Sequence, residues 1–198
     1  VTYLSFYPYL IVKIRTTGKQ SGNMDFQQSK TYQNLQSAFA YEAQSKAKFD
    51  IYSEKARQED LIGISFSFDT ISRNDRFIAE RLRNLINGGE PDTQQNLTEA
   101  VASELYAGNT MYRDYSKIAV EEGYGDIASL FNGIANIKLN HNYVLQSYLN
   151  NMQNNTLFCK NEAKLWICLG CGNIMSGLCA PTLCPICGYP QGYYELFV

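Results

Sequence analysis

The stretches N-L-Q-S-A-F-A-Y-E (34–42) and N-L-T-E-A-V-A-S-E (96–104) share the pattern N-L-x-x-A-x-A-x-E, so that Glu42 corresponds to Glu104. Further along, Tyr52 corresponds to Tyr115, after the offset between the copies has grown by one position. Both copies lie in long segments with few helix-breaking residues. A repeat of this kind predicts two related helical hairpins, which together make a four-helix bundle.

The turn cluster N-G-G-E-P-D at residues 87–92 separates the two hairpins. The predicted helices cover residues 30–58, 61–85, 93–121 and 125–151. The predicted domains are an N-terminal extension (1–28), the helical bundle (29–151), a polar connector (152–163) and a small domain (164–198). Residues before Met24 receive no predicted function.

Composition narrows the range of partners. The chain has 198 residues, of which 45% are hydrophobic, and 17 Lys and Arg stand against 19 Asp and Glu. The formal charge of −2 gives no basic excess of the kind that drives nucleic-acid binding. The longest apolar stretch, residues 4–12, falls well short of the ~20 residues that cross a bilayer. We therefore expect neither a nucleic-acid partner nor a membrane span.

All six cysteines lie within the last forty residues, which favours a metal site over a disulfide framework and a reducing cytoplasm over secretion. Four of them form the pairs C-L-G-C (168–171) and C-P-I-C (184–187), each followed by glycine. Two such turns offer four sulfur ligands in a tetrahedron, which suits zinc or iron. Cys159 and Cys179 lie outside this pattern and are expected to be ordinary thiols.

The surroundings of these pairs are distinctive. The segments W-I-C-L-G-C-G-N-I (166–174), C-P-I-C-G (184–188) and Y-Y-E-L (193–196) closely resemble the rubredoxin-like domain that ends rubrerythrins. The resemblance implies one iron that carries single electrons, bound by the four cysteines Cys168, Cys171, Cys184 and Cys187. A structural zinc ribbon remains the alternative from the spacing alone.

Residues 32–148 also resemble the ferritin-like bundle of rubrerythrins, in which each hairpin supplies a Glu and a Glu-x-x-His to a diiron site. The resemblance places four possible metal ligands at Glu42, Asp75, Glu104 and His141. Three other ligand positions are substituted, by Ile78, Ala107 and Lys138. Ile and Ala cannot bind a metal, and a Lys ammonium repels one.

Three states of this bundle site follow. In the favoured one, Lys138 pairs with Glu42 or Asp75 and the core holds no metal. In the second, Asp75, Glu104 and His141 bind a single Fe(II) or Mn(II). In the third, a diiron site survives.

The resemblance implies a fold class and an activity. The fold is mainly α, a ferritin-like four-helix bundle followed by a small rubredoxin-like metal-binding domain. Rubrerythrins reduce hydrogen peroxide with electrons passed through the rubredoxin-type iron. The resemblance also implies a homodimer and an electron-donating reductase as partners. The substituted ligands predict impaired diiron chemistry, so whether this chain is an oxidoreductase stays open. The alternatives are a non-catalytic electron carrier or interaction scaffold, and a structural zinc protein.

Overall fold

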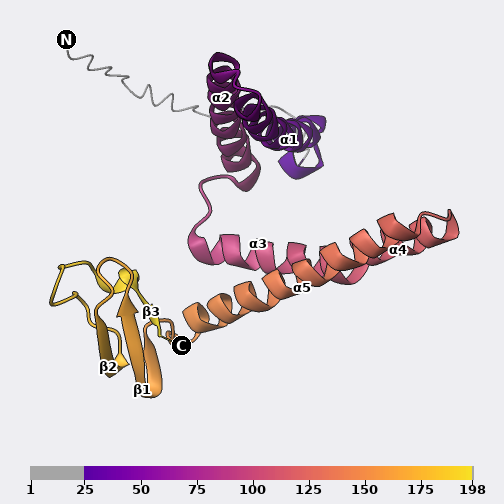
Figure 1. The fold of residues 1–198 in the computed structure, drawn as a ribbon. Helices are drawn as coiled ribbons and strands as arrows, with labels where there is room; N and C mark the ends of the chain where they lie inside the picture. Colours follow the sequence, from indigo (N-terminus) through magenta and orange to yellow (C-terminus); the bar gives the residue numbers. More distant parts are fainter. Residues whose placement is uncertain (1–24, 198) are drawn as a thin grey trace, which may run out of the picture. The chain divides into compact units, whose positions relative to one another are not determined.

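The structure, a computed structural model, describes residues 25–197 (Figure 1). The predicted N-terminal extension therefore lies outside the described residues up to position 24. The chain forms two compact units that divide between Glu90 and Pro91. Among the helices of residues 25–197, none combines the length and apolarity that a membrane crossing needs.

The first unit is a hairpin of α1 (Lys30–Gln58) and α2 (Ile62–Asn87). A short 3-10 turn precedes it, and the Ser29 side chain caps α1 by accepting a hydrogen bond from a backbone N–H in its first turn. Gly88 ends α2 with a φ of 72°, a left-handed conformation that glycine adopts without a Cβ penalty.

The second unit opens with another hairpin. Its first arm is α3 (Thr93–Tyr106), a π-helical turn (Ala107–Met111) and α4 (Tyr112–Glu121), and its second arm is α5 (Gly125–Gln153). Both α3 and α4 pack on α5. Asp92 and Gln95 form a reciprocal capping box at the start of α3. The predicted helices therefore exist, with ends shifted by one or two residues and one local change of winding.

The two hairpins repeat each other in three dimensions as well as in sequence. An aromatic cluster joins Phe49, Tyr52 and Phe68 in the first. Its counterpart in the second hairpin consists of Tyr112, Tyr115 and Phe131. The buried Ser53 hydroxyl donates to the Ser65 carbonyl across the first hairpin, and the buried Ser116 hydroxyl donates to the Ala128 carbonyl across the second. All these pairs share the offset that relates Tyr52 to Tyr115, so the repeat is structural.

The π-helical turn explains why the offset between the repeats changes. The interval from Glu104 to Tyr115 is one position longer than the interval from Glu42 to Tyr52. The second copy therefore contains one extra residue between these positions. A π turn absorbs one inserted residue without breaking the helix. The residues of the turn, Ala107–Met111, occupy this interval.

The C-terminal part is a three-stranded antiparallel sheet in the order β2-β1-β3, formed by β1 (Cys159–Cys168), β2 (Ile174–Cys179) and β3 (Tyr194–Leu196). Its core contains five buried residues, Trp166, Cys168, Ala180, Cys184 and Tyr194. The indole N–H of Trp166 donates to the Gly177 carbonyl, so this large ring is buried with its polar atom satisfied. The predicted order of long helices followed by a small domain is confirmed, while the exact domain limits stay predictions.

One expectation is wrong. Cys159 and Cys179 are not separate thiols, because they face each other at the start of β1 and the end of β2 and form a disulfide. They are 20 residues apart in sequence but directly paired in the sheet. Only the antiparallel strand pairing brings them together, and spacing relative to the C-x-x-C pairs does not reveal it.

Candidate metal centres

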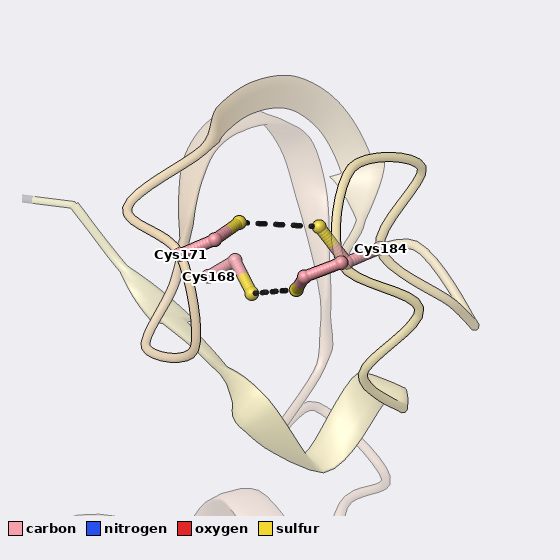
Figure 2. A group of neighbouring side chains, drawn as sticks. Cys168, Cys171 and Cys184 are labelled. Atoms are coloured by element: carbon pink, nitrogen blue, oxygen red, sulfur yellow. Dashed lines mark hydrogen bonds between the residues drawn. The ribbon is translucent and has the colours of Figure 1, made fainter.

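The structure brings the four cysteines of the two C-x-x-C pairs together (Figure 2). Their sulfur atoms all lie within 4.8 Å of one another. The sulfurs of Cys168 and Cys187 are 3.7 Å apart, and those of Cys171 and Cys184 are 3.6 Å apart. Cys168 is the last residue of β1 and Cys171 lies just after it, whereas Cys184 and Cys187 lie in the loop between β2 and β3.

Each cysteine pair is held in a tight turn of the same design. In the first, the Gly172 N–H donates to the Cys168 carbonyl over 2.7 Å, and in the second the Gly188 N–H donates to the Cys184 carbonyl over 2.9 Å. Both glycines have a positive φ, 77° and 71°. A side chain is strained in that conformation, which explains why glycine follows each pair.

The sulfur cage has the size that a metal requires. A metal–sulfur bond of about 2.3 Å in a tetrahedron places the sulfurs about 3.8 Å apart, and two of the observed separations come within about 0.2 Å of that value. The donor set is four thiols, which suits iron or zinc. The residues present therefore fit the metal that the sequence predicts.

The ionisation of the thiols also favours a cation. The Tyr189 N–H acts to lower the pKa of Cys187, but burial and the three neighbouring thiols outweigh it and raise that pKa to about 12. Four crowded sulfurs cannot all be thiolates without a positive charge between them. A metal ion provides that charge, and the cage is poorly suited to stay empty.

Tyr194 contacts the centre from β3. Proximity to the Tyr194 hydroxyl is the main cause that lowers the pKa of Cys184 to about 6, with backbone N–H groups adding to it. The same interaction raises the pKa of Tyr194 to about 12. Tyr194 is 4% exposed, so the ring covers the sulfur and keeps water from it.

The second candidate centre lies between α3 and α5. Glu104 on α3 is held at both carboxylate oxygens: Lys138 Nζ lies 2.8 Å from Oε1, and His141 Nδ1 lies 3.0 Å from Oε2. Burial acts to raise the pKa of Glu104, but the two α5 side chains outweigh it and leave that pKa below its ordinary value. The carboxylate is therefore ionised and occupied by protein donors.

The other candidate ligands lie in the first unit. Asp75 on α2 is 9% exposed, and its Oδ2 atom is buried with no hydrogen-bond partner among residues 25–197. Glu42 is half-buried on α1, and Ile78 on α2 is 46% exposed. Ala107 is buried in the π turn. The set of four possible ligands is thus divided, two in each unit, and its metal binding stays a prediction.

The pairing of Lys138 differs from the expected one in one respect. The sequence pointed to Glu42 or Asp75 as its partner, whereas the ion pair in the structure is with Glu104. The spacing carried a signal for this: Lys138 and His141 are three residues apart, so they project from one face of α5 and both can reach a carboxylate on the adjacent α3. A pairing of Lys138 with the first unit stays a prediction.

Comparisons with known proteins find relatives of both the helical part and the cysteine-containing domain. Residues 33–149 match the family described as rubrerythrin, and residues 166–195 match the rubrerythrin rubredoxin-like domain. The rubrerythrin-1 of Clostridium acetobutylicum is 32% identical over 85% of this chain and 94% of its own length. The rubrerythrin of Nitratidesulfovibrio vulgaris is 31% identical with the same coverage.

Among solved structures, a mixed-valence nigerythrin is 21% identical, with 92% of this chain and 90% of that chain covered at a TM-score of 0.32. The predicted fold class, mainly α and ferritin-like with a small rubredoxin-like domain, is confirmed by the family matches and by the order of helices and strands. With the match covering more than half of the residues and both domains present, this chain belongs to the rubrerythrin family.

Proposed function

We propose that this protein is a rubrerythrin-type redox protein whose four-cysteine centre binds one iron and transfers single electrons, and whose diiron chemistry is impaired. The impairment of the diiron chemistry rests on one observation: Lys138 and His141 each bind one carboxylate oxygen of Glu104. Two of the groups that would surround a metal instead bind each other. Peroxide reduction is consequently weak or lost relative to the family.

In the C-terminal domain, the iron supplies one-electron redox chemistry when it is bound. Cys168, Cys171, Cys184 and Cys187 hold it, and the two glycine turns keep the sulfurs in place. Buried Trp166 and Tyr194 exclude water from one side. Cys171 is exposed, which leaves a short path for electrons to enter or leave.

In the helical part, the Lys138 ammonium provides the positive charge that a metal would provide to Glu104. A carboxylate that is only 19% exposed is stabilised by such a charge. This supports the metal-free state of the helical site most strongly. A single Fe(II) or Mn(II) on Asp75, Glu104 and His141 is the second state, favoured by the unpartnered Oδ2 of Asp75 among the residues that the structure describes.

The partners and location follow from the same assignment. Reduction of one peroxide to two waters takes two electrons and two protons, and single electrons at the cysteine centre must come from a reductase. We place the protein in the cytoplasm as a homodimer, and the family of its relatives supports this placement.

The test is iron and zinc content per chain in protein purified without oxygen. We expect about one iron, a visible spectrum that bleaches on reduction, and slow peroxide-dependent oxidation in a single turnover. About three irons and rapid oxidation would contradict the impaired site. One zinc and no iron would contradict the redox function altogether.

A variant tests the cause. Lys138→Glu combined with Ile78→His restores two ligand positions, so we expect bound iron to rise by one to two per chain. The matched control is Lys117→Glu, because Lys117 is 72% exposed on α4 and pairs with Asp114 of its own helix. Equal iron in both variants would show that Lys138 is not the cause.

A further inference from the structure

The connection between the two hairpins is too short for a ferritin-like bundle to close within one chain. A ferritin-like bundle has one long crossover, because its second and third helices run parallel and the chain must return along the bundle between them. Here α2 ends at Asn87 and α3 begins at Thr93, which leaves Gly88–Asp92 as the connector.

The length of α2 can be compared with the reach of the connector. The 26 residues of α2 extend about 39 Å at 1.5 Å per residue. The connector, even fully extended, reaches about 20 Å. It therefore covers about half of the path that the crossover has to cover. The family match indicates that a four-helix bundle forms. The Gly88–Asp92 connector is too short for one chain to form that bundle by itself.

Both hairpins nevertheless carry a face that requires a partner. On α2 a stripe of apolar side chains recurs every seven residues, each at least one-third exposed: Ile64, Ile71, Ile78 and Leu85. Side chains spaced by seven lie on one helix face. The repeat-equivalent positions on α5, related by the Tyr52–Tyr115 offset, form a second stripe: Ile127, Ile134, His141 and Tyr148. The matching positions of the two stripes indicate that they cover each other.

The buried carboxylate of Asp75 also indicates that α2 has a partner. The Oδ2 atom of Asp75, a residue that is 9% exposed, has no partner among residues 25–197. A buried carboxylate oxygen without a partner is costly. Lys138 and His141 stand at the repeat-equivalent positions of Asp75 and Ile78, so bundle closure would bring a cation toward that carboxylate.

From these observations we infer that the occupant of each stripe is a second copy of this chain: the α1–α2 hairpin of one copy packs on the α3–α5 hairpin of the other. Such an exchange needs no long crossover, and a short hinge favours it. The helical site then combines Glu42 and Asp75 of one copy with Glu104 and His141 of the other. The inference rests on the proposed function in that both require the ferritin-like bundle to form.

A photo-crosslink in the full chain tests the exchange. The crosslinker p-benzoylphenylalanine replaces Ile78, and the products are separated on a reducing denaturing gel and mapped by mass spectrometry. We expect a product with the mass of two chains, joined from position 78 to α3 or α5. The same label at Glu80 is the control, since two residues turn the side chain by about 200° away from Ile78. It should give at least fivefold less of this product.

The outcomes separate the two proposals. The same link within a single chain would overturn the exchange and leave the proposed function intact. No link to α3 or α5 would overturn both the exchange and the shared helical site. A second variant carries about fourteen added Gly and Ser residues after Gly89, long enough to span α2. It should move the link to the single-chain product, and an unchanged two-chain product would show that connector length is not the cause.

Discussion

At the scale of single residues, one position in each candidate centre has closely placed neighbours. Gly170, inside the first cysteine pair, lies under the Tyr189 ring: an added Cβ would come within 1.9 Å of that ring. Tyr189 in turn stacks on Tyr193, with ring centroids 4.4 Å apart. In the helical part, Glu104 is the residue to which two α5 side chains converge. Steric space restricts the residue at Gly170, whereas charge determines the contacts of Glu104.

We predict that Gly170→Ala loosens the metal centre. The added methyl group must displace the Tyr189 ring, which costs about 1–3 kcal/mol as in other overpacked sites. The measurements are the thermal midpoint and the rate of iron loss to a chelator. Gly192→Ala is the control, because its Cβ would meet nothing within 4 Å. If both variants lose iron at the same rate, steric contact with Tyr189 is not the determinant.

We predict that Lys138→Met destabilises the fold by about 1–2 kcal/mol at pH 7, because Glu104 keeps a charge but loses one of its two partners. The folded-state pKa of Glu104 lies below its ordinary value of 4.5. The stabilising effect is therefore complete above pH 4.5 and is lost as the pH falls through the lower, folded-state pKa.

Urea unfolding of both proteins at pH 7 and at about pH 3 measures this effect. The difference between wild type and variant should shrink at the lower pH. Lys117→Met removes an exposed pair and should change stability by less than about 0.5 kcal/mol. A difference that is the same at both pH values would contradict the assignment of Glu104 as the titrating partner.

At the scale of the elements, the helical hairpins and the sheet are each closed by a specific contact. Gly108 in the π turn packs so closely on α5 that an added Cβ would lie 2.8 Å from the Leu139 side chain and 3.0 Å from the Ala135 carbonyl. In the C-terminal domain, the Cys159–Cys179 disulfide joins the start of β1 to the end of β2. Both contacts depend on neighbours that are distant in sequence.

We predict that Gly108→Ala separates the π turn from α5 and lowers stability by about 1–3 kcal/mol. Gly133→Ala on α5 is the matched control, because open space surrounds it. Alanine there should stabilise the helix by about 0.5–1 kcal/mol. Thermal unfolding followed by circular dichroism measures both, and effects of the same sign would contradict the close contact.

We predict that Cys159→Ser with Cys179→Ser lowers the stability of the C-terminal domain by about 2–4 kcal/mol, because the closed loop no longer restricts the unfolded chain. A thiol reductant should weaken the wild type similarly and leave the double variant unchanged. Mass spectrometry after alkylation of oxidised protein counts the free thiols. Two alkylated residues at these positions would contradict the disulfide.

At the scale of the whole molecule, both the C-terminal domain and the helical hairpins have little buried core of their own. The C-terminal domain has five residues in its buried core, two of them metal-ligand positions, Cys168 and Cys184. So small a core is marginal without a metal. The first hairpin leaves the apolar stripe on α2 uncovered within its own unit, and the second leaves Ile127 and Tyr148 of the α5 stripe exposed.

We predict that removing the metal unfolds the C-terminal domain and spares the helices. A chelator in oxygen-free buffer without a thiol reductant, which leaves the Cys159–Cys179 disulfide intact, should make residues 159–197 sensitive to protease while the helical signal in circular dichroism changes little. The reason is that metal-binding free energy contributes directly to folding in small sulfur sites. A domain that stays protease-resistant without metal would contradict a metal-dependent fold.

Most of the fold could be predicted from the sequence because the signals are local. Helix positions follow from periodicity and breakers, and the ends differ by one or two residues, as at Leu85 against the observed Asn87. The grouping of the four cage cysteines follows from the pair spacing and from the glycine after each pair. The repeat relates Glu42 to Glu104, and the resemblance to rubrerythrins predicts that both are ligand positions.

The remaining features depend on contacts between distant residues. Local sequence was enough to establish the two hairpins, the cysteine cage and the family. Long-range folding was needed to establish that Cys159 bonds Cys179, that Lys138 and His141 bind Glu104, and that a π turn takes up the inserted residue. The physical reason is that helix formation and tight turns are set by neighbours within a few residues, whereas strand register and helix packing are set by long-range burial.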